Sequence, residues 1–277
     1  MRPTPPSEQR QRCGGFTLIE AVVVIAIVGV LAAVVGRFIV PPVQAYLSTQ
    51  ARAALIDQAD LALRRIGRDL RIALPNSTRV TPSGLALELI PTSGAARYKT
   101  EGTNRLEFGT PDTAFDLIGP PLVVAAAQNL VFYNLGPGVT GSDAYAPIST
   151  ATEQASSNRR ISSTPAGSAS SLALSSLAGL PVGGFAPPYR VFAVDTPVSY
   201  RCDLASGTLT RYSGYAFSAA QPDPPPIASG AVLASGVSAC RFSSDGTLVA
   251  ARAAIVNLAL TLAATTVVGT ESVSLQH

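Results

Sequence analysis

The chain has 277 residues, of which 47% are hydrophobic and only 13% charged, and its mean hydropathy is +0.31. Its formal net charge is +3, and three arginines lie within the first fifteen residues, so the rest of the chain is close to neutral. This balance gives no electrostatic reason to expect a nucleic-acid partner. Once the leading segment and the apolar run after it are set aside, about 235 residues remain, enough for one domain or two small ones.

The first feature along the chain is a basic segment followed by a long apolar run. Residues 21–35 contain no charged or polar side chain. From residue 16 to residue 40 the run spans about 25 residues, enough for a helix to cross a hydrocarbon core of about 30 Å. The preceding arginines place the N-terminus in the cytoplasm by the positive-inside rule, so we expect the body to lie outside it.

Glu20 lies at the start of this run, where an ordinary membrane anchor carries no charge. A carboxylate at bilayer depth costs up to ~3 kcal/mol unless a partner neutralises it. If the chain is cut between Gly15 and Phe16, the new α-amino group lies four residues before Glu20, close to one helical turn. The amine and the carboxylate can then satisfy each other, within one chain or between neighbouring chains.

A secretory signal peptide or a simple anchor is the alternative interpretation of a basic segment before an apolar run. Such segments usually avoid an acid within the run and place small residues after it. Here the pair Gly14-Gly15 precedes the run, and no A-x-A-type cleavage site follows Val40. Cleavage before the run is therefore favoured.

Pro41-Pro42 follow the span and cannot donate backbone hydrogen bonds, so we expect the helix to kink or break there and then resume. Over residues 43–74 apolar side chains recur at spacings typical of a helix, and the opposite face is charged. This stripe predicts an amphipathic helix that lies against a sheet and ends at Pro75. The apolar positions are Leu47, Leu55, Ala59, Ala62, Ile66, Leu70 and Leu74.

Beyond Pro75 the hydrophobic period changes to about two, in short segments bounded by Gly, Pro, Asn, Asp or Ser. The pattern predicts an α+β fold in which the long N-terminal helix packs on an antiparallel β-sheet domain. Candidate strands are 85–90, 105–108, 130–133, 190–194, 198–202, 208–212, 232–234, 239–243 and 254–262, with hairpin turns at 205–207 and 244–246. The predicted organisation is a leader over 1–15, a transmembrane helix over 16–40, an amphipathic helix over 41–74 and a β-rich head over 75–277.

Residues 137–188 are rich in Gly, Ser, Thr, Ala and Pro, and their apolar side chains recur with almost no regular period. A loop of this length is uncommon in a compact domain and is usually functional or disordered. We expect irregular, flexible coil here, with a small ordered subdomain as the alternative. The proline-rich sequence of residues 221–227 predicts a second irregular loop.

The chain has three cysteines, and Cys13 lies in the segment that cleavage would remove. Cys202 and Cys240 then remain as an even pair in a compartment expected to be oxidising, which favours a disulfide over two buried free thiols. The bridge would close a loop of roughly 39 residues and contribute about 4 kcal/mol on the chain-entropy model.

The sequence contains no recognisable motif for catalysis or for a cofactor. It has no G-x-S-x-G elbow, no standard phosphate loop, and one histidine, His277. Two lone cysteines do not complete a zinc shell. We therefore expect no enzyme, no cofactor and no metal centre. Asp112 with Asp116, or Asp195 with Asp203, remains an alternative calcium site, although neither pair lies in a dense acidic loop.

The segment Gly14-Gly15-Phe16-Thr17-Leu18-Ile19-Glu20 in front of an apolar helix resembles the processing site of type IV pilins and pseudopilins. The resemblance implies cleavage after Gly15 by a prepilin peptidase, N-methylation of Phe16, and pairing of Glu20 with the N-terminus of a neighbouring subunit. It also implies a single-pass inner-membrane protein with a periplasmic body, which later assembles with other pilins into a pilus or pseudopilus.

Several stretches of the body are similar to the minor pilin-like proteins of mannose-sensitive haemagglutinin pilus biogenesis. The likeness covers most of the chain apart from residues 137–188, and it implies a part in pilus assembly or initiation. A tip pseudopilin of type II secretion and a tip adhesin or binding module remain alternatives. The similar stretches are 65–71, 73–77, 129–136, 197–203, 209–212, 236–240 and 271–277.

Overall fold

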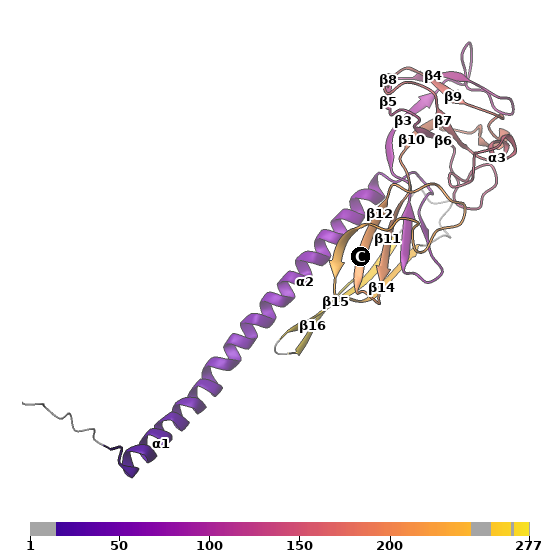
Figure 1. Cartoon of the computed structure of the whole chain (residues 1–277). Helices are drawn as coiled ribbons and strands as arrows, with labels where there is room; N and C mark the ends of the chain where they lie inside the picture. The colour runs from indigo at the N-terminus through magenta and orange to yellow at the C-terminus, as the bar shows by residue number, and fades with distance from the viewer. Residues whose placement is uncertain (1–14, 245–255, 267–268, 277) are drawn as a thin grey trace, which may run out of the picture.

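The computed structural model of the chain describes residues 15–244, 256–266 and 269–276. One long N-terminal helix carries a head of antiparallel β-sheets at its C-terminal end (Figure 1), which confirms the α+β prediction. The expectations for residues 1–14, including Cys13, and most of the expected turn at 244–246 lie outside the described residues.

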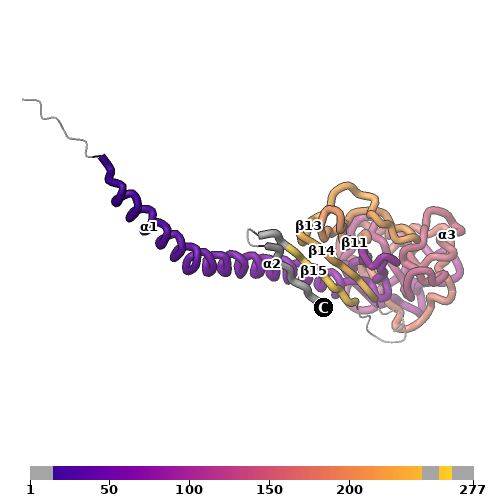
Figure 2. The backbone as a smooth tube through the Cα atoms, turned by 90° about the horizontal axis from the view of Figure 1, so that it is seen from below, coloured from indigo at the N-terminus to yellow at the C-terminus, as the bar shows by residue number. Residues whose placement is uncertain are grey.

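The helix is continuous from Leu18 to Arg71. It consists of α1 (Leu18–Val34), a π-helical segment η1 (Val35–Ile39) and α2 (Val40–Arg71). Pro41 and Pro42 occupy the first turn of α2, where a missing N–H is tolerated, and the wider π-helical turn lies directly before them. The helix curves between α1 and α2 without breaking (Figure 2), and it ends at Arg71 rather than at Leu74.

The C-terminal half of α2 packs against a β-sheet wall, as its apolar stripe predicts. Leu55, Ala59, Ala62 and Ile66 are buried there in one hydrophobic core with the strands. Each leucine-sized side chain removed from water contributes roughly 1.5–3 kcal/mol, so this core holds the head on the helix. The wall contains a five-stranded sheet of β1 (Arg79–Val80), β2 (Ala86–Leu89), β11 (Val198–Asp203), β12 (Thr208–Ser213) and β13 (Ala231–Ser235), and a three-stranded sheet of β14 (Val237–Ser244), β15 (Val256–Thr266) and β16 (Gly269–Gln276).

A second lobe lies beyond the C-terminal end of α2 (Figure 1) and is a closed barrel. Its centre holds the rings of Tyr98, Phe115 and Phe132, whose centroids are 5.8–6.4 Å apart in edge-to-face contact. Around the barrel the strands are β10 (Arg190–Val194), β3 (Thr92–Tyr98), β4 (Ala114–Ile118), β9 (Ser171–Ser175), β7 (Arg159–Ser162) and β6 (Asn129–Phe132). Its connections contain the pair β5 (Leu122–Val124) and β8 (Gly167–Ala169), the helix α3 (Ala151–Ala155) and the 3-10 turn η2 (Val182–Gly184).

The barrel differs from the sequence-based expectation in two places. Residues 137–188 supply α3 and three strands instead of irregular coil, because β7 and β9 are ordered by pairing with β6 and β4. Strand β9 (SLALS) does alternate, with Leu172 and Leu174 buried, but β7 (RRIS) and β8 (GSA) have too little apolar alternation to reveal this pairing. The expected strand at 105–108 is also absent, and Phe108 alone makes an isolated bridge, to Leu180.

The buried side chain of Arg160, on β7, forms hydrogen bonds to two of the segments that connect the barrel strands. Its side chain is fully buried (0% exposed), and burial lowers the pKa of its guanidinium to about 10. The structure brings no carboxylate to it among the hydrogen bonds of the described residues. Instead its two terminal nitrogens donate, over 2.8–3.0 Å, to the carbonyl oxygens of Gln154, Ser157, Arg159, Ala178 and Gly179.

Substitution Arg160→Lys should lower the free energy of unfolding by about 2 kcal/mol, because an ammonium cannot satisfy five carbonyl oxygens from one point and leaves some of them buried without a donor. Denaturant unfolding of the purified protein measures the loss. The matched control is Arg105→Lys, at a half-exposed arginine on the same lobe, which should change stability by less than about 0.5 kcal/mol. Equal effects of the two substitutions would contradict the assignment.

A buried ion pair joins β1 to β2 near the junction of the lobes. Arg79 Nε lies 2.6 Å from Glu88 Oε2, and Tyr215 donates to Glu88 Oε1 over 2.9 Å. The Arg79 guanidinium also donates to the carbonyl oxygens of residues 218–219 and stacks 3.6 Å above the ring of Tyr145. Burial raises the pKa of Glu88, and the hydrogen bonds from Arg79 and Tyr215 oppose this rise.

Candidate functional site

The N-terminal turn of α1 holds the residues that the sequence singles out for processing and assembly. Thr17 caps the helix: its hydroxyl and carbonyl oxygens accept the backbone N–H of Glu20 over 3.3 and 3.1 Å. Glu20 therefore lies in the first helical turn, where the helix dipole favours a negative charge. Gly15 and Phe16 precede the cap, so a cut between them would leave the new amino group beside this turn.

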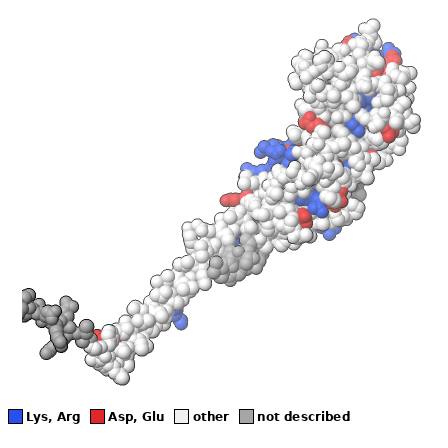
Figure 3. Space-filling model, viewed as in Figure 1, with Lys and Arg blue, Asp and Glu red and all other residues white. Residues whose placement is uncertain are grey.

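The helix α1 offers a wholly unpaired apolar surface. None of its residues is buried, and Phe16, Leu18 and Ile19 are 74%, 85% and 69% exposed. Figure 3 shows the surface of this part of the helix almost free of charge, whereas charged side chains gather over α2 and the head. Among the described residues there is one helix long and apolar enough to cross a membrane, which is consistent with membrane anchoring.

Gly15 is unrestrained by the rest of the chain. A Cβ atom added there would meet nothing within 4 Å, and Gly29 on α1 is equally open. Packing against the described residues therefore imposes no requirement for glycine at position 15, and a partner that binds the segment is the expected source of one.

The structure joins Cys202 on β11 and Cys240 on β14 in a disulfide. Their Cα atoms are 6.3 Å apart, and 38 positions separate them in the sequence. Since β11 and β14 belong to different sheets, the bridge ties together the two parts of the wall that faces α2.

The aspartates considered for calcium make local contacts. A hydrogen bond from the Asn104 side chain holds the pKa of Asp116 below its usual range, and one from the Ala205 backbone N–H does the same for Asp203. Asp112 accepts two backbone N–H groups of its own loop. Within the described parts of the chain, no group of three or more His, Cys, Asp or Glu side chains is placed to hold a metal ion.

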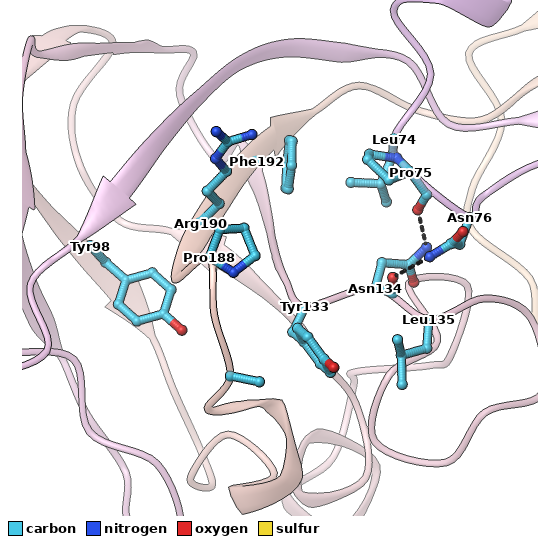
Figure 4. Close-up of a pocket in the computed structure, with 11 residues that line it drawn as sticks. Leu74, Pro75, Asn76, Tyr98, Tyr133, Asn134, Leu135, Pro188, Arg190 and Phe192 are labelled. Atoms are coloured by element: carbon cyan, nitrogen blue, oxygen red, sulfur yellow. Dashed lines mark hydrogen bonds between the residues drawn. The ribbon is translucent and has the colours of Figure 1, made fainter. Parts of the chain in front are cut away.

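A cavity at the junction of the lobes was not indicated by the sequence. It has a volume of about 250 Å³ and is lined by residues from the segment that follows the long helix and from three parts of the barrel lobe (Figure 4). Its lining residues are dispersed between positions 74 and 192 and share no motif. No sequence pattern could have placed them together.

A family model described as the prokaryotic N-terminal methylation motif matches residues 10–36. The motif indicates a type IV pilin-like or pseudopilin-like protein. More particularly, it indicates a structural subunit that is processed by a prepilin peptidase and assembles with other pilins. No curated protein and no solved structure matches the chain.

Proposed function

We propose that this protein is a minor pilin-like subunit of a mannose-sensitive haemagglutinin-type type IV pilus, of the MshO kind, with a part in pilus assembly or initiation. Cleavage occurs between Gly15 and Phe16, and Phe16 is N-methylated. The observation that carries the pilin class and its processing is the methylation motif over residues 10–36, which contains α1, a helix without any buried residue.

The unburied helix explains how one segment serves two locations. Before assembly, α1 lies in the inner membrane as a single span, with the head in the periplasm. On assembly it exchanges lipid for the helices of neighbouring subunits, so Glu20 needs a polar partner in an apolar layer. The N-terminal amine of a neighbour supplies that partner, and a charge pair in such surroundings fixes axial register more than it adds affinity.

The shape of the head supports a place at the end of the filament. The barrel lobe extends beyond the C-terminal end of α2, away from α1 (Figure 1). A further subunit added in that direction would meet this lobe, whereas a tip subunit has nothing above it. A tip pseudopilin of type II secretion is the structural alternative, because it shares the processing site and the helix.

The expected product of processing is a chain that begins at N-methylated Phe16. Intact-mass and N-terminal analysis of protein from membranes containing a prepilin peptidase should show loss of residues 1–15 and gain of one methyl group. Gly15→Ala should yield the uncut precursor, while Gly29→Ala, which is equally open in the structure, should be processed normally. An uncut wild-type chain, or a cut beyond Val40, would contradict the proposal.

A further inference from the structure

The cavity where the segment after α2 meets the barrel lobe has apolar walls with a few polar groups, the composition typical of a ligand site. Its volume of about 250 Å³ is slightly below the range of roughly 300–1,000 Å³ usual for small-molecule sites, so it suits a single ring. The lining residues are Leu74, Pro75, Asn76, Tyr98, Tyr133, Asn134, Leu135, Ala186, Pro188, Arg190 and Phe192.

Tyr98 supplies an unused hydrogen-bonding group at the inner end of this cavity. The side chain is 1% exposed, and its hydroxyl, which points toward the cavity in Figure 4, has no hydrogen-bond partner among the described residues. The other buried tyrosines are all paired: Tyr145 with the Ser77 carbonyl, Tyr200 with Asp69 and Tyr215 with Glu88. This hydroxyl is not among the fully enclosed unpaired atoms of the described residues, so it is open to the cavity, where a bound polar group would give it a partner.

Arg190 supplies a positive charge at the exposed end of the cavity. Arg97 lies directly opposite it in the β10–β3 register, on the same face of the sheet. Neither arginine forms an ion pair within the described part of the chain, and like charges in this arrangement repel each other. An anionic group at the mouth would relieve this repulsion.

The backbone around the cavity is held in unusual conformations. Asn76 and Tyr133 line it with φ angles of 60° and 41°, and Tyr189, next to two lining residues, has a φ of 55°. Such conformations are uncommon for residues other than glycine. They persist only where the surrounding structure holds them in place, and they are frequent at ligand sites. They indicate that the shape of this cavity is fixed before a ligand arrives.

We propose that the cavity binds a phenol ring that carries a carboxylate, the chemistry of a tyrosine with a free carboxyl end. The ring lies among Tyr133, Pro188 and Phe192, its hydroxyl group bonds to the Tyr98 hydroxyl, and its carboxylate pairs with Arg190. A free aromatic acid and the C-terminal tyrosine of a protein both offer this chemistry.

The test measures binding of three probes to the full-length protein in detergent by ligand-observed NMR. N-acetyl-tyrosine should bind saturably, and its amide, which lacks the carboxylate, roughly 10-fold more weakly. N-acetyl-phenylalanine, which lacks the hydroxyl, should bind about 5-fold more weakly. Absence of saturable binding of N-acetyl-tyrosine up to about 10 mM would overturn the proposal.

Two variants assign each interaction to its residue. Arg190→Gln should abolish the preference for the acid over the amide, and Tyr98→Phe should abolish the preference for tyrosine over phenylalanine. Arg105→Gln, on the same lobe outside the cavity, should leave both preferences intact. Tyr98→Phe should not lower the thermal unfolding temperature, because its hydroxyl has no partner to lose. Preferences that survive both cavity substitutions would overturn the proposal.

A short peptide ending in tyrosine distinguishes the two sources of the ligand. Tighter binding of the peptide than of N-acetyl-tyrosine supports recognition of a protein C-terminus at this cavity. Equal affinity supports recognition of the free acid. A peptide that ends in tyrosine amide should lose affinity by the same factor as the small amide, and unchanged affinity would contradict the role of Arg190.

Discussion

Glu20→Ala should be processed normally and yet be largely lost from the filament. Processing should be intact because Glu20 lies beyond the cut, and the cap of α1 depends on Thr17 oxygens rather than on the Glu20 carboxylate. Assembly should fail because the amine of a neighbouring subunit stays buried without its anion. Breaking one side of a buried charge pair costs about 3–5 kcal/mol, which corresponds to a more than 100-fold loss of incorporation.

The measurement is the ratio of this subunit in sheared filaments to that in membranes, with the N-terminal mass determined in parallel. Asp57→Ala is the matched control, since it removes an exposed acid from α2, which continues the same helix. Its incorporation should equal that of the wild type. If Glu20→Ala entered filaments at the wild-type ratio, the pairing of Glu20 with a neighbour would be wrong.

Glu88→Gln should lower the free energy of unfolding by about 3–5 kcal/mol, because it leaves the buried guanidinium of Arg79 without an anion. The Arg79 side chain is only 9% exposed, so water cannot replace the lost carboxylate. Its other contacts, to the carbonyl oxygens of residues 218–219 and to the ring of Tyr145, leave it little freedom to move toward solvent. Denaturant unfolding followed by tyrosine fluorescence measures the loss.

Two controls separate the buried pair from a general charge effect. Glu107→Gln breaks a half-exposed pair with Arg105 and should cost less than about 1 kcal/mol. In a double-mutant cycle, Arg79→Gln with Glu88→Gln should lose less than the two single substitutions added together. A loss below about 1 kcal/mol for Glu88→Gln would show that the pair does not hold β1 and β2 together.

The sequence by itself determined the long helix and the segment proposed for processing. Helical periodicity is local, since the apolar positions that face one core recur every three or four residues. The stripe that includes Leu55, Ala59 and Ile66 therefore predicted which side of α2 meets the sheet. Gly15, Phe16 and Glu20 likewise form a contiguous signal that needs no tertiary contact to be recognised.

Only the tertiary structure decided the barrel lobe and its cavity. A strand such as β3, with the sequence TSGAARY, has little apolar alternation, and it is ordered by β10 and β4 from distant parts of the chain. Arg160 looks like any surface cation in the sequence, yet carbonyl groups from two connections enclose it. The cavity joins Asn76, Tyr98 and Arg190 across more than a hundred residues. Such contacts depend on non-local pairing, which local patterns do not encode.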